Sequence, residues 1–192
     1  MTRRPGFAVI SAVLLAAAAL PARAADPVLS LTATALNLDG PGRSRTSTLQ
    51  ISFERWSTDE ERKALFDTIV EKDPDALSGA LQKTPKVGFI RTTTSLGWNI
   101  HYARMEPTAS GGTRIVFATD RPMSFREAAN AGRSTDYDVL VAEIRLGPDG
   151  KGDGRLVPAA KVTYDREQRV IEIENYNNQP VRLTQVTADK KK

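Results

Sequence analysis

Apolar and polar residues alternate along most of this chain, with the period of two that is typical of half-buried β-strands. The alternation is clean in STLQISFERW, residues 47–56, where Leu49, Ile51 and Phe53 share one face. It is looser in VLSLTATALNL, residues 28–38. The stretch between them, DGPGRS at residues 39–44, is rich in turn-forming residues. These two runs therefore predict an antiparallel pair of strands.

The pattern then changes to that of a helix, in STDEERKALFDTIVEKD from Ser57. Thr58 and Glu61 have the spacing of a capping box, which predicts that the helix begins there. An apolar stripe follows at Leu65, Phe66, Ile69 and Val70. Asp73-Pro74 predicts the start of a second, short helix, and Thr84-Pro85 predicts its end. We expect a helical insertion at residues 58–83.

The remainder of the chain again has strand-like runs, separated by turn residues. These runs lie at residues 86–92, 98–105, 113–119, 137–146, 155–164, 169–176 and 180–187. The last four have short connections, at residues 165–167 and at Asn177-Asn178 for two of them, and so predict a four-strand antiparallel meander. The predicted fold is mostly β (α+β), an antiparallel β-barrel or sandwich of about nine strands with a helical insertion after the second strand.

The N-terminal segment has the features of a secretory signal peptide. Arg3 and Arg4 precede the apolar run FAVISAVLLAAAAL, and small residues follow at Ala22 and Ala24. The run has 14 residues, fewer than the roughly 20 that cross a bilayer. We predict residues 1–24 as a signal peptide, by the general or the twin-arginine route, and residues 25–192 as one domain with a short basic C-terminal tail. The predicted location is periplasmic or secreted in a bacterium, with no transmembrane segment after cleavage.

Charge and composition narrow the range of functions. The formal net charge of +4 falls to +1 on cleavage, because three arginines and no acidic residue lie in the predicted signal peptide. The near-neutral domain has no basic patch interleaved with aromatic residues, so we predict no nucleic-acid partner. There is no cysteine, which excludes disulfides, thiol catalysis and cysteine-bound metals. We predict no cofactor and no metal.

The stretch LGPDGKGDGRL, from Leu146 to Leu156, resembles loops that bind ions. Counting from Asp149, a calcium loop needs oxygen ligands at its third and twelfth positions, where Lys151 and Ala160 stand. A phosphate loop needs a helix next, and a strand pattern follows instead. We interpret the stretch as a glycine-rich hairpin loop, with a loose surface calcium site through Asp149 and Asp153 as the alternative.

The run GWNIHYARM contains the most plausible ligand-binding face. Alternation places Trp98 and Tyr102 on one strand face, together with Arg104 near the strand end. Two aromatic rings and one guanidinium suit an amphipathic ligand with an acidic head, although the same face can be ordinary core. His101, the only histidine, falls on the other face, and we expect a structural or solvent-facing role for it.

The loop ATDRPMSF, residues 118–125, is the second candidate. Arg121 can act as a donor fork for an anion with Asp120 fixing it, or the two can form a simple turn with Pro122. Glu143 and Arg145 are expected to pair across strands. The sequence contains no Gly-x-Ser-x-Gly motif, which would surround a nucleophilic serine, so we predict no catalytic residue.

Six stretches together are similar to a family of exported bacterial proteins with no assigned activity. They are RWSTDEER from Arg55, KVGFIRT from Lys86, IVFATDRP from Ile115, DYDVLVAEIRL from Asp136, GKGDGRL from Gly150 and ENYNNQPVRLTQV from Glu174. The resemblance implies secretion and a single domain over nearly all of the mature chain. It implies no catalytic residue.

The predicted function is an exported non-catalytic binding protein for a small apolar or amphipathic ligand. The predicted binding residues are Trp98, Tyr102, Arg104, Asp120 and Arg121. A first alternative is an interaction module for another envelope protein, which a free sheet edge or an exposed apolar patch would favour. A second is an enzyme of unrecognised type that uses the charged residues of the same set.

Overall fold

The computed structural model describes residues 27–37, 45–71, 76–122, 138–175 and 180–189. Several sequence predictions lie outside the described residues: the signal peptide at 1–24, the turn at 39–44, the Asp73-Pro74 helix start, the Asn177-Asn178 turn and the basic tail. The domain boundary at residue 25 and the export route therefore stay predictions.

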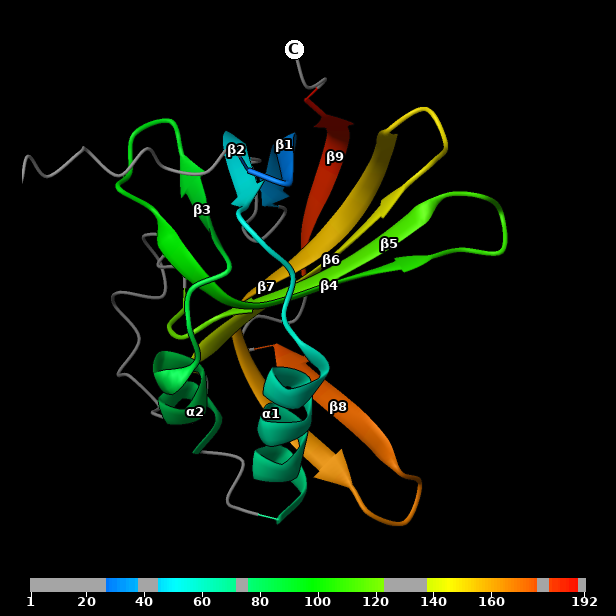
Figure 1. Ribbon diagram of the computed structural model, residues 1–192. Coiled ribbons are helices and arrows are strands. Elements are labelled where there is room, and N and C mark those ends of the chain that lie inside the picture. Colours follow the sequence, from blue (N-terminus) through cyan, green and yellow to red (C-terminus); the bar gives the residue numbers. More distant parts are fainter. Residues whose placement is uncertain (1–26, 38–44, 72–75, 123–137, 176–179, 190–192) are drawn as a thin grey trace, which may run out of the picture.

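The described residues form nine strands and two helices (Figure 1). The strands are β1 Leu29–Asn37, β2 Arg45–Phe53, β3 Gly88–Thr92, β4 Trp98–Pro107, β5 Thr113–Thr119, β6 Val139–Leu146, β7 Lys151–Asp165, β8 Val170–Asn175 and β9 Val181–Ala188. The helices are α1 Asp59–Glu71 and α2 Leu77–Lys83, both inserted between β2 and β3. Among the described residues, neither helix is long and apolar enough to cross a membrane.

Eight of the strands close into an antiparallel barrel, which confirms the predicted fold. Hydrogen-bonded neighbours follow the order β6-β5-β4-β3-β2-β1-β9-β7, and β6 also pairs with β7, which closes the ring. The ninth strand, β8, lies outside the ring and pairs with β7. The predicted β1–β2 antiparallel pair is present in full register from Leu29 opposite Phe53 to Asn37 opposite Arg45.

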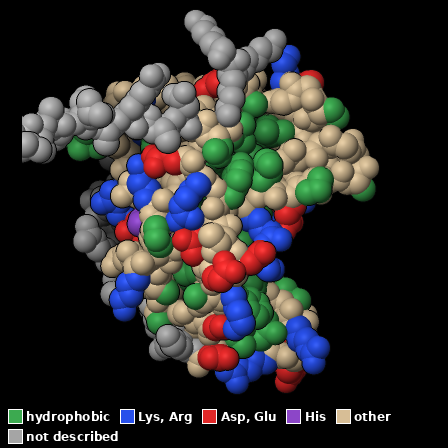
Figure 2. Space-filling view, in the orientation of Figure 1, with side chains coloured by type: hydrophobic (Ala, Val, Ile, Leu, Met, Phe, Trp, Pro, Cys, Tyr) green, Lys and Arg blue, Asp and Glu red, His purple; other side chains and the backbone are tan. Residues whose placement is uncertain are grey.

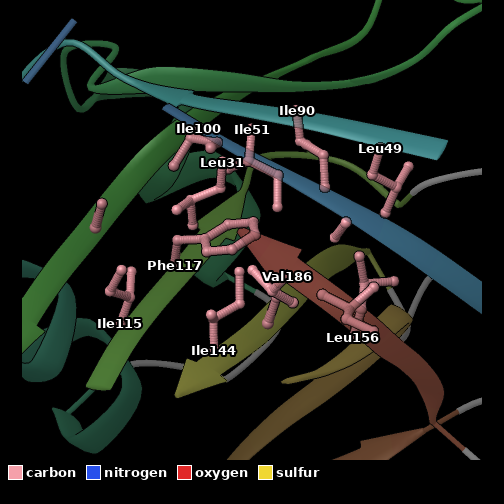
Figure 3. Packing of buried hydrophobic residues seen from close by; sticks show 14 of the residues in the cluster. Leu31, Leu49, Ile51, Ile90, Ile100, Ile115, Phe117, Ile144, Leu156 and Val186 are labelled. Atoms are coloured by element: carbon pink, nitrogen blue, oxygen red, sulfur yellow. The ribbon is translucent and has the colours of Figure 1, made fainter. Parts of the chain in front are cut away.

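The barrel interior is filled by apolar side chains (Figure 3). Alternation along each strand directs every second residue inward, as predicted for Leu49, Ile51 and Phe53. The Phe53 and Phe117 rings meet edge to face with centroids 5.6 Å apart. The largest fully buried side chains also include Leu31, Ile90, Ile100, Ile115, Leu140 and Ile144. These side chains therefore form a packed core inside the barrel.

The helical insertion packs on the outside of the barrel and makes a second apolar cluster. Leu65 of α1 and Leu77 and Leu81 of α2 meet outward-facing residues of β5, β6 and β7. The predicted capping box is present, because Glu61 N donates to Thr58 Oγ1 at 3.2 Å and Thr58 N donates to Glu61 Oε2 at 3.0 Å. In the predicted apolar stripe, Leu65 is buried and Ile69 packs against the same cluster, whereas Phe66 is 43% exposed and contacts the Tyr164 ring.

The predicted glycine-rich loop is shorter than expected. The turn spans residues 147–150, where Gly150 has φ of +75° and Asp149 Oδ1 accepts a hydrogen bond from Lys151 N at 3.1 Å. β7 begins directly afterwards, at Lys151. A Cβ atom on Gly152 would overlap the carbonyl oxygen of Arg145 on β6, so this glycine allows close strand approach rather than a loop.

The predicted four-strand meander is wrong for its last strand. β6, β7 and β8 are consecutive neighbours, but β9 pairs with β1 and with the first half of β7 instead of β8. The β6–β7 register shifts between Val139 opposite Ala160 and Val141 opposite Val157. Pro158 lies in this shift and has no N–H for a ladder, which suits a bend in the strand. Beyond the bend β7 leaves β9 and continues with β8 as a hairpin beside α1 (Figure 1).

Candidate binding surfaces

A β-bulge in β4 separates the two aromatic residues of the predicted binding face. The β4–β5 register shifts between Ile100 opposite Thr119 and Tyr102 opposite Ala118. Ile100 and Ala103 are both buried in the barrel core, so the alternation changes phase between them. Trp98 packs against the barrel core, whereas Tyr102 packs with the outer cluster under the helices. The expectation that Trp98, Tyr102 and Arg104 share one face is therefore wrong.

His101 sits at the bulge and has a structural role. Its side chain is buried, and Nδ1 lies 2.7 Å from the Thr84 carbonyl oxygen at the end of α2. Since a carbonyl oxygen only accepts, Nδ1 carries the proton and donates. Nε2 lies 3.8 Å from Asp120 Oδ1 at the end of β5. The imidazole thus joins the helical insertion, β4 and the end of β5.

The Asp120-Arg121 corner does not form the predicted anion fork among the described contacts. Asp120 faces His101, while Arg121 donates from Nη2 to the Gly97 carbonyl oxygen at 3.4 Å. The Arg121 carbonyl oxygen in turn accepts a bond from Thr119 Oγ1 at 2.6 Å. The two side chains therefore support different parts of the fold. Their role in ligand binding stays a prediction.

Arg104 belongs to a band of alternating charges across the outside of the barrel, which we call the outer charged row. Arg104 contacts Glu106 at 2.8 Å and Asp59 of α1 at 3.2 Å. Arg114 joins Glu106 at 3.5 Å to Glu143 at 3.2 Å, and Arg145 contacts the same Glu143 at 2.7 Å. Figure 2 shows charged side chains of both signs interspersed across the middle of one face.

Electrostatics within the outer charged row favour the ionised forms. Hydrogen bonds from Arg114, reinforced by those from Arg145, hold the pKa of Glu143 below its ordinary value against the opposing effect of partial burial. The expected cross-strand pairing of Glu143 is thus present with Arg114, whereas Arg145 pairs with it along the same strand. Burial raises the pKa of the neighbouring Tyr102 phenol, which therefore stays neutral at physiological pH.

A groove of about 550 Å³ lies at the end of the outer charged row, outside the barrel. Its lining comes from β6, β7 and the start of β9: Glu143, Arg145, Asp153, Gly154, Arg155, Pro180, Arg182 and Leu183. Arg155 and Arg182 are cross-strand neighbours in the β7–β9 register. None of the five predicted binding residues lines this groove.

A second surface lies between α1 and the β7–β8 hairpin, and we call it the α1–β8 apolar surface: Phe66, Tyr164, Ile171 and Ile173. Phe66 and Tyr164 meet edge to face at 5.9 Å, and Tyr164 is opposite Ile171 in the strand register. The exposed fractions of Phe66, Ile171 and Ile173 are 43%, 42% and 47%. In Figure 2, hydrophobic side chains lie between the places that α1 and β8 occupy in Figure 1.

The described side chains form no cluster that could hold a metal ion. Within residues 27–37, 45–71, 76–122, 138–175 and 180–189, no three His, Asp or Glu side chains gather as metal ligands would. Asp149 bonds within its own turn, and Asp153 stands opposite Arg145 on the neighbouring strand. Of the described hydrogen bonds, none joins His101 to a hydroxyl that could serve as a nucleophile.

Comparison with known proteins identifies no relative. No protein-family model, no curated protein and no solved structure matches this chain. The outer groove and the α1–β8 apolar surface are therefore the candidate binding sites of this protein.

Proposed function

We propose that this protein is an exported, non-catalytic binding module that binds an extended segment of another envelope protein along β8. The observation that carries the proposal is an edge strand with an exposed apolar surface beside it. This is the feature that distinguishes an interaction module from a carrier that holds its ligand inside the barrel.

The edge of β8 has the polar groups that such binding needs. Within the described residues β8 pairs only with β7, so the outward row of backbone N–H and C=O groups on residues 170–173 has no strand partner. An extended peptide can add to such an edge as a further strand, and its backbone hydrogen bonds then supply affinity. Residues 170–173 of this strand offer a length of about 13 Å for this pairing.

The α1–β8 apolar surface supplies side-chain contacts next to that edge. Ile171 and Ile173 lie on the face of the hairpin that Tyr164 shares, because cross-strand partners point to the same side of a sheet. An added strand would place every second side chain over this surface. The surface should therefore select a partner segment in which apolar and polar residues alternate.

The hairpin is held in place before any partner binds. Arg166 Nη2 at its tip donates to the Val70 carbonyl oxygen near the C-terminus of α1 at 2.8 Å. A cation at a helix C-terminus is also favoured by the helix dipole. The Phe66–Tyr164 ring contact fixes the hairpin to the same helix close to its turn. Such preorganisation reduces the entropy lost on binding.

The alternative of a small apolar ligand inside the barrel has less support. The side chains of the barrel core occupy the interior, and Trp98 contributes to that core instead of lining a chamber. A small-molecule function remains a candidate only for the outer groove, whose lining is polar and charged.

The test uses photo-cross-linking in cells that express the full chain. A photoreactive amino acid replaces Ile173, and in a matched control it replaces Leu96, an equally apolar and fully exposed residue in the β3–β4 turn. We expect a discrete protein adduct in the envelope fraction from position 173 and none from position 96. The absence of an adduct at 173, or identical adducts at both positions, contradicts the proposal.

A further inference from the structure

Two arginines face each other across neighbouring strands, and no described carboxylate forms an ion pair with either of them. Arg155 on β7 and Arg182 on β9 are direct partners in the antiparallel register, and both are exposed. The described residues provide neither guanidinium group with a hydrogen bond or an ion pair. The outer groove of about 550 Å³ opens over both.

The neighbouring carboxylates do not neutralise this pair. Glu143 is opposite Arg155 in the β6–β7 register, but its oxygens contact Arg114 and Arg145 instead. Asp153 is opposite Arg145. Like charges directly opposite on adjacent strands have Cβ atoms about 5 Å apart and destabilise the sheet. An anion bound between the two guanidinium groups would remove that repulsion.

We propose that this groove binds a small molecule that carries a phosphate monoester and free hydroxyl groups. A phosphate has three terminal oxygens that accept from two guanidinium forks at once, whereas one fork already satisfies a carboxylate. The groove is larger than one phosphate needs and falls within the range of about 300–1,000 Å³ seen for small-molecule sites. Most of the remaining side chains in the lining are charged, namely Glu143, Arg145 and Asp153, beside the apolar Pro180 and Leu183, and these charges favour a hydroxylated ligand over a lipid.

Asp153 supplies the second part of the recognition. It lines the groove on the same strand as Arg155, two residues away, and so lies on the same face. Its carboxylate makes no side-chain ion pair with a described residue and can accept hydrogen bonds from ligand hydroxyls. β7 and β9, which carry these residues, each have a strand partner on both sides in the closed barrel, so the site lies on a rigid part of the fold. This proposal does not depend on partner binding at β8.

Titration calorimetry on the purified protein tests the site, with glucose 6-phosphate, inorganic phosphate and glucose as probes. We expect glucose 6-phosphate to bind more tightly than inorganic phosphate, and glucose not to bind. Arg182→Gln and, separately, Arg155→Gln should each weaken glucose 6-phosphate binding by about tenfold or more, the usual effect of losing charge-assisted hydrogen bonds. Arg91→Gln is the matched control, because this exposed arginine of β3 lies outside the groove, and it should bind like the wild type.

Three results would overturn the proposal. The first is no binding of glucose 6-phosphate at about 10 mM, a weak limit for a dedicated site. The second is unchanged affinity in both groove variants, or an equal loss of affinity in Arg91→Gln, which would mean that the effect is not specific to the groove. The third is equal affinity for inorganic phosphate, which would remove the assignment of a hydroxyl-bearing ligand. Circular dichroism of each variant checks that the barrel is folded.

Discussion

Truncation of Phe117 measures whether the barrel interior is packed. This ring is fully buried and meets Phe53 edge to face at 5.6 Å. A buried phenylalanine changed to alanine costs about 3–5 kcal/mol, because transfer energy is lost and a cavity remains. The lost aromatic contact is worth about 0.5–1.5 kcal/mol beyond its area, so we place the value for Phe117→Ala near 4 kcal/mol. That is a large part of the roughly 5–15 kcal/mol that stabilises a domain.

Urea unfolding of the wild type and Phe117→Ala gives the difference directly, from the shift in midpoint at unchanged slope. For a domain of this size the melting temperature should fall by about 8–16 °C, from roughly 2–4 °C per kcal/mol. Leu96→Ala is the control, because Leu96 is fully exposed and its truncation should change stability by less than about 0.5 kcal/mol.

A loss of less than about 1 kcal/mol in Phe117→Ala would refute the reasoning. It would mean that the ring borders empty space, and the hypothesis of a carrier with a hollow barrel would regain support. Benzene provides a second readout, since a dry apolar cavity binds it. We expect benzene to raise the melting temperature of Phe117→Ala and to leave that of the wild type unchanged.

Three other substitutions test local features of the structure. Gly152→Ala should prevent close β6–β7 pairing and destabilise the barrel strongly, because the new Cβ overlaps the Arg145 carbonyl oxygen. Gly79→Ala is the matched change in α2, where open space surrounds the glycine, and it should stabilise the protein by about 0.5–1 kcal/mol in the same urea assay. Glu61→Gln should cost about 1 kcal/mol near pH 7. Hydrogen bonds from Arg55 lower the pKa of Glu61, so its contribution is complete above the unfolded-state value of about 4.3 and disappears as the pH falls through the folded-state pKa. Unfolding curves of wild type and Glu61→Gln should converge below that range, and a constant difference down to pH 2 would contradict this account.

Local patterns were sufficient to predict most elements of the fold. Alternation places Leu49, Ile51 and Phe53 inside the barrel, and the spacing of Thr58 and Glu61 marks the start of α1. Each of these signals depends only on residues close together in the chain. The strand count and the helical insertion followed from them, and so did the mostly β fold class.

Features that depend on pairing between distant strands were not predictable in this way. The bulge between Ile100 and Tyr102 reverses the faces of the residues after it, and nothing in GWNIHYARM marks it as such. The run KGDGR looks like a loop from its glycines, yet it forms strand because Gly152 accommodates the Arg145 backbone. Composition alone does not distinguish a glycine that turns the chain from one that allows close approach.

The groove arginines were missed for the same reason. Arg155 precedes the buried Leu156, and Arg182 lies between the buried Val181 and Leu183, so alternation already directs both outward. The missing information was that β7 pairs with β9, since the short connections favoured a β8–β9 pair. Without that pairing, the two charges are distant residues in separate hairpins.

The bend at Pro158 explains why the protein has two distinct surfaces. Before the bend, β7 lies between β6 and β9, and the barrel places Arg155 beside Arg182 on a rigid outer wall. After the bend, the same strand leaves β9 and carries β8 away from the ring, so β8 has a partner on one side only among the described strands. A closed barrel has no edges to offer. One strand that is longer than the barrel requires therefore provides both the anion groove and the free edge.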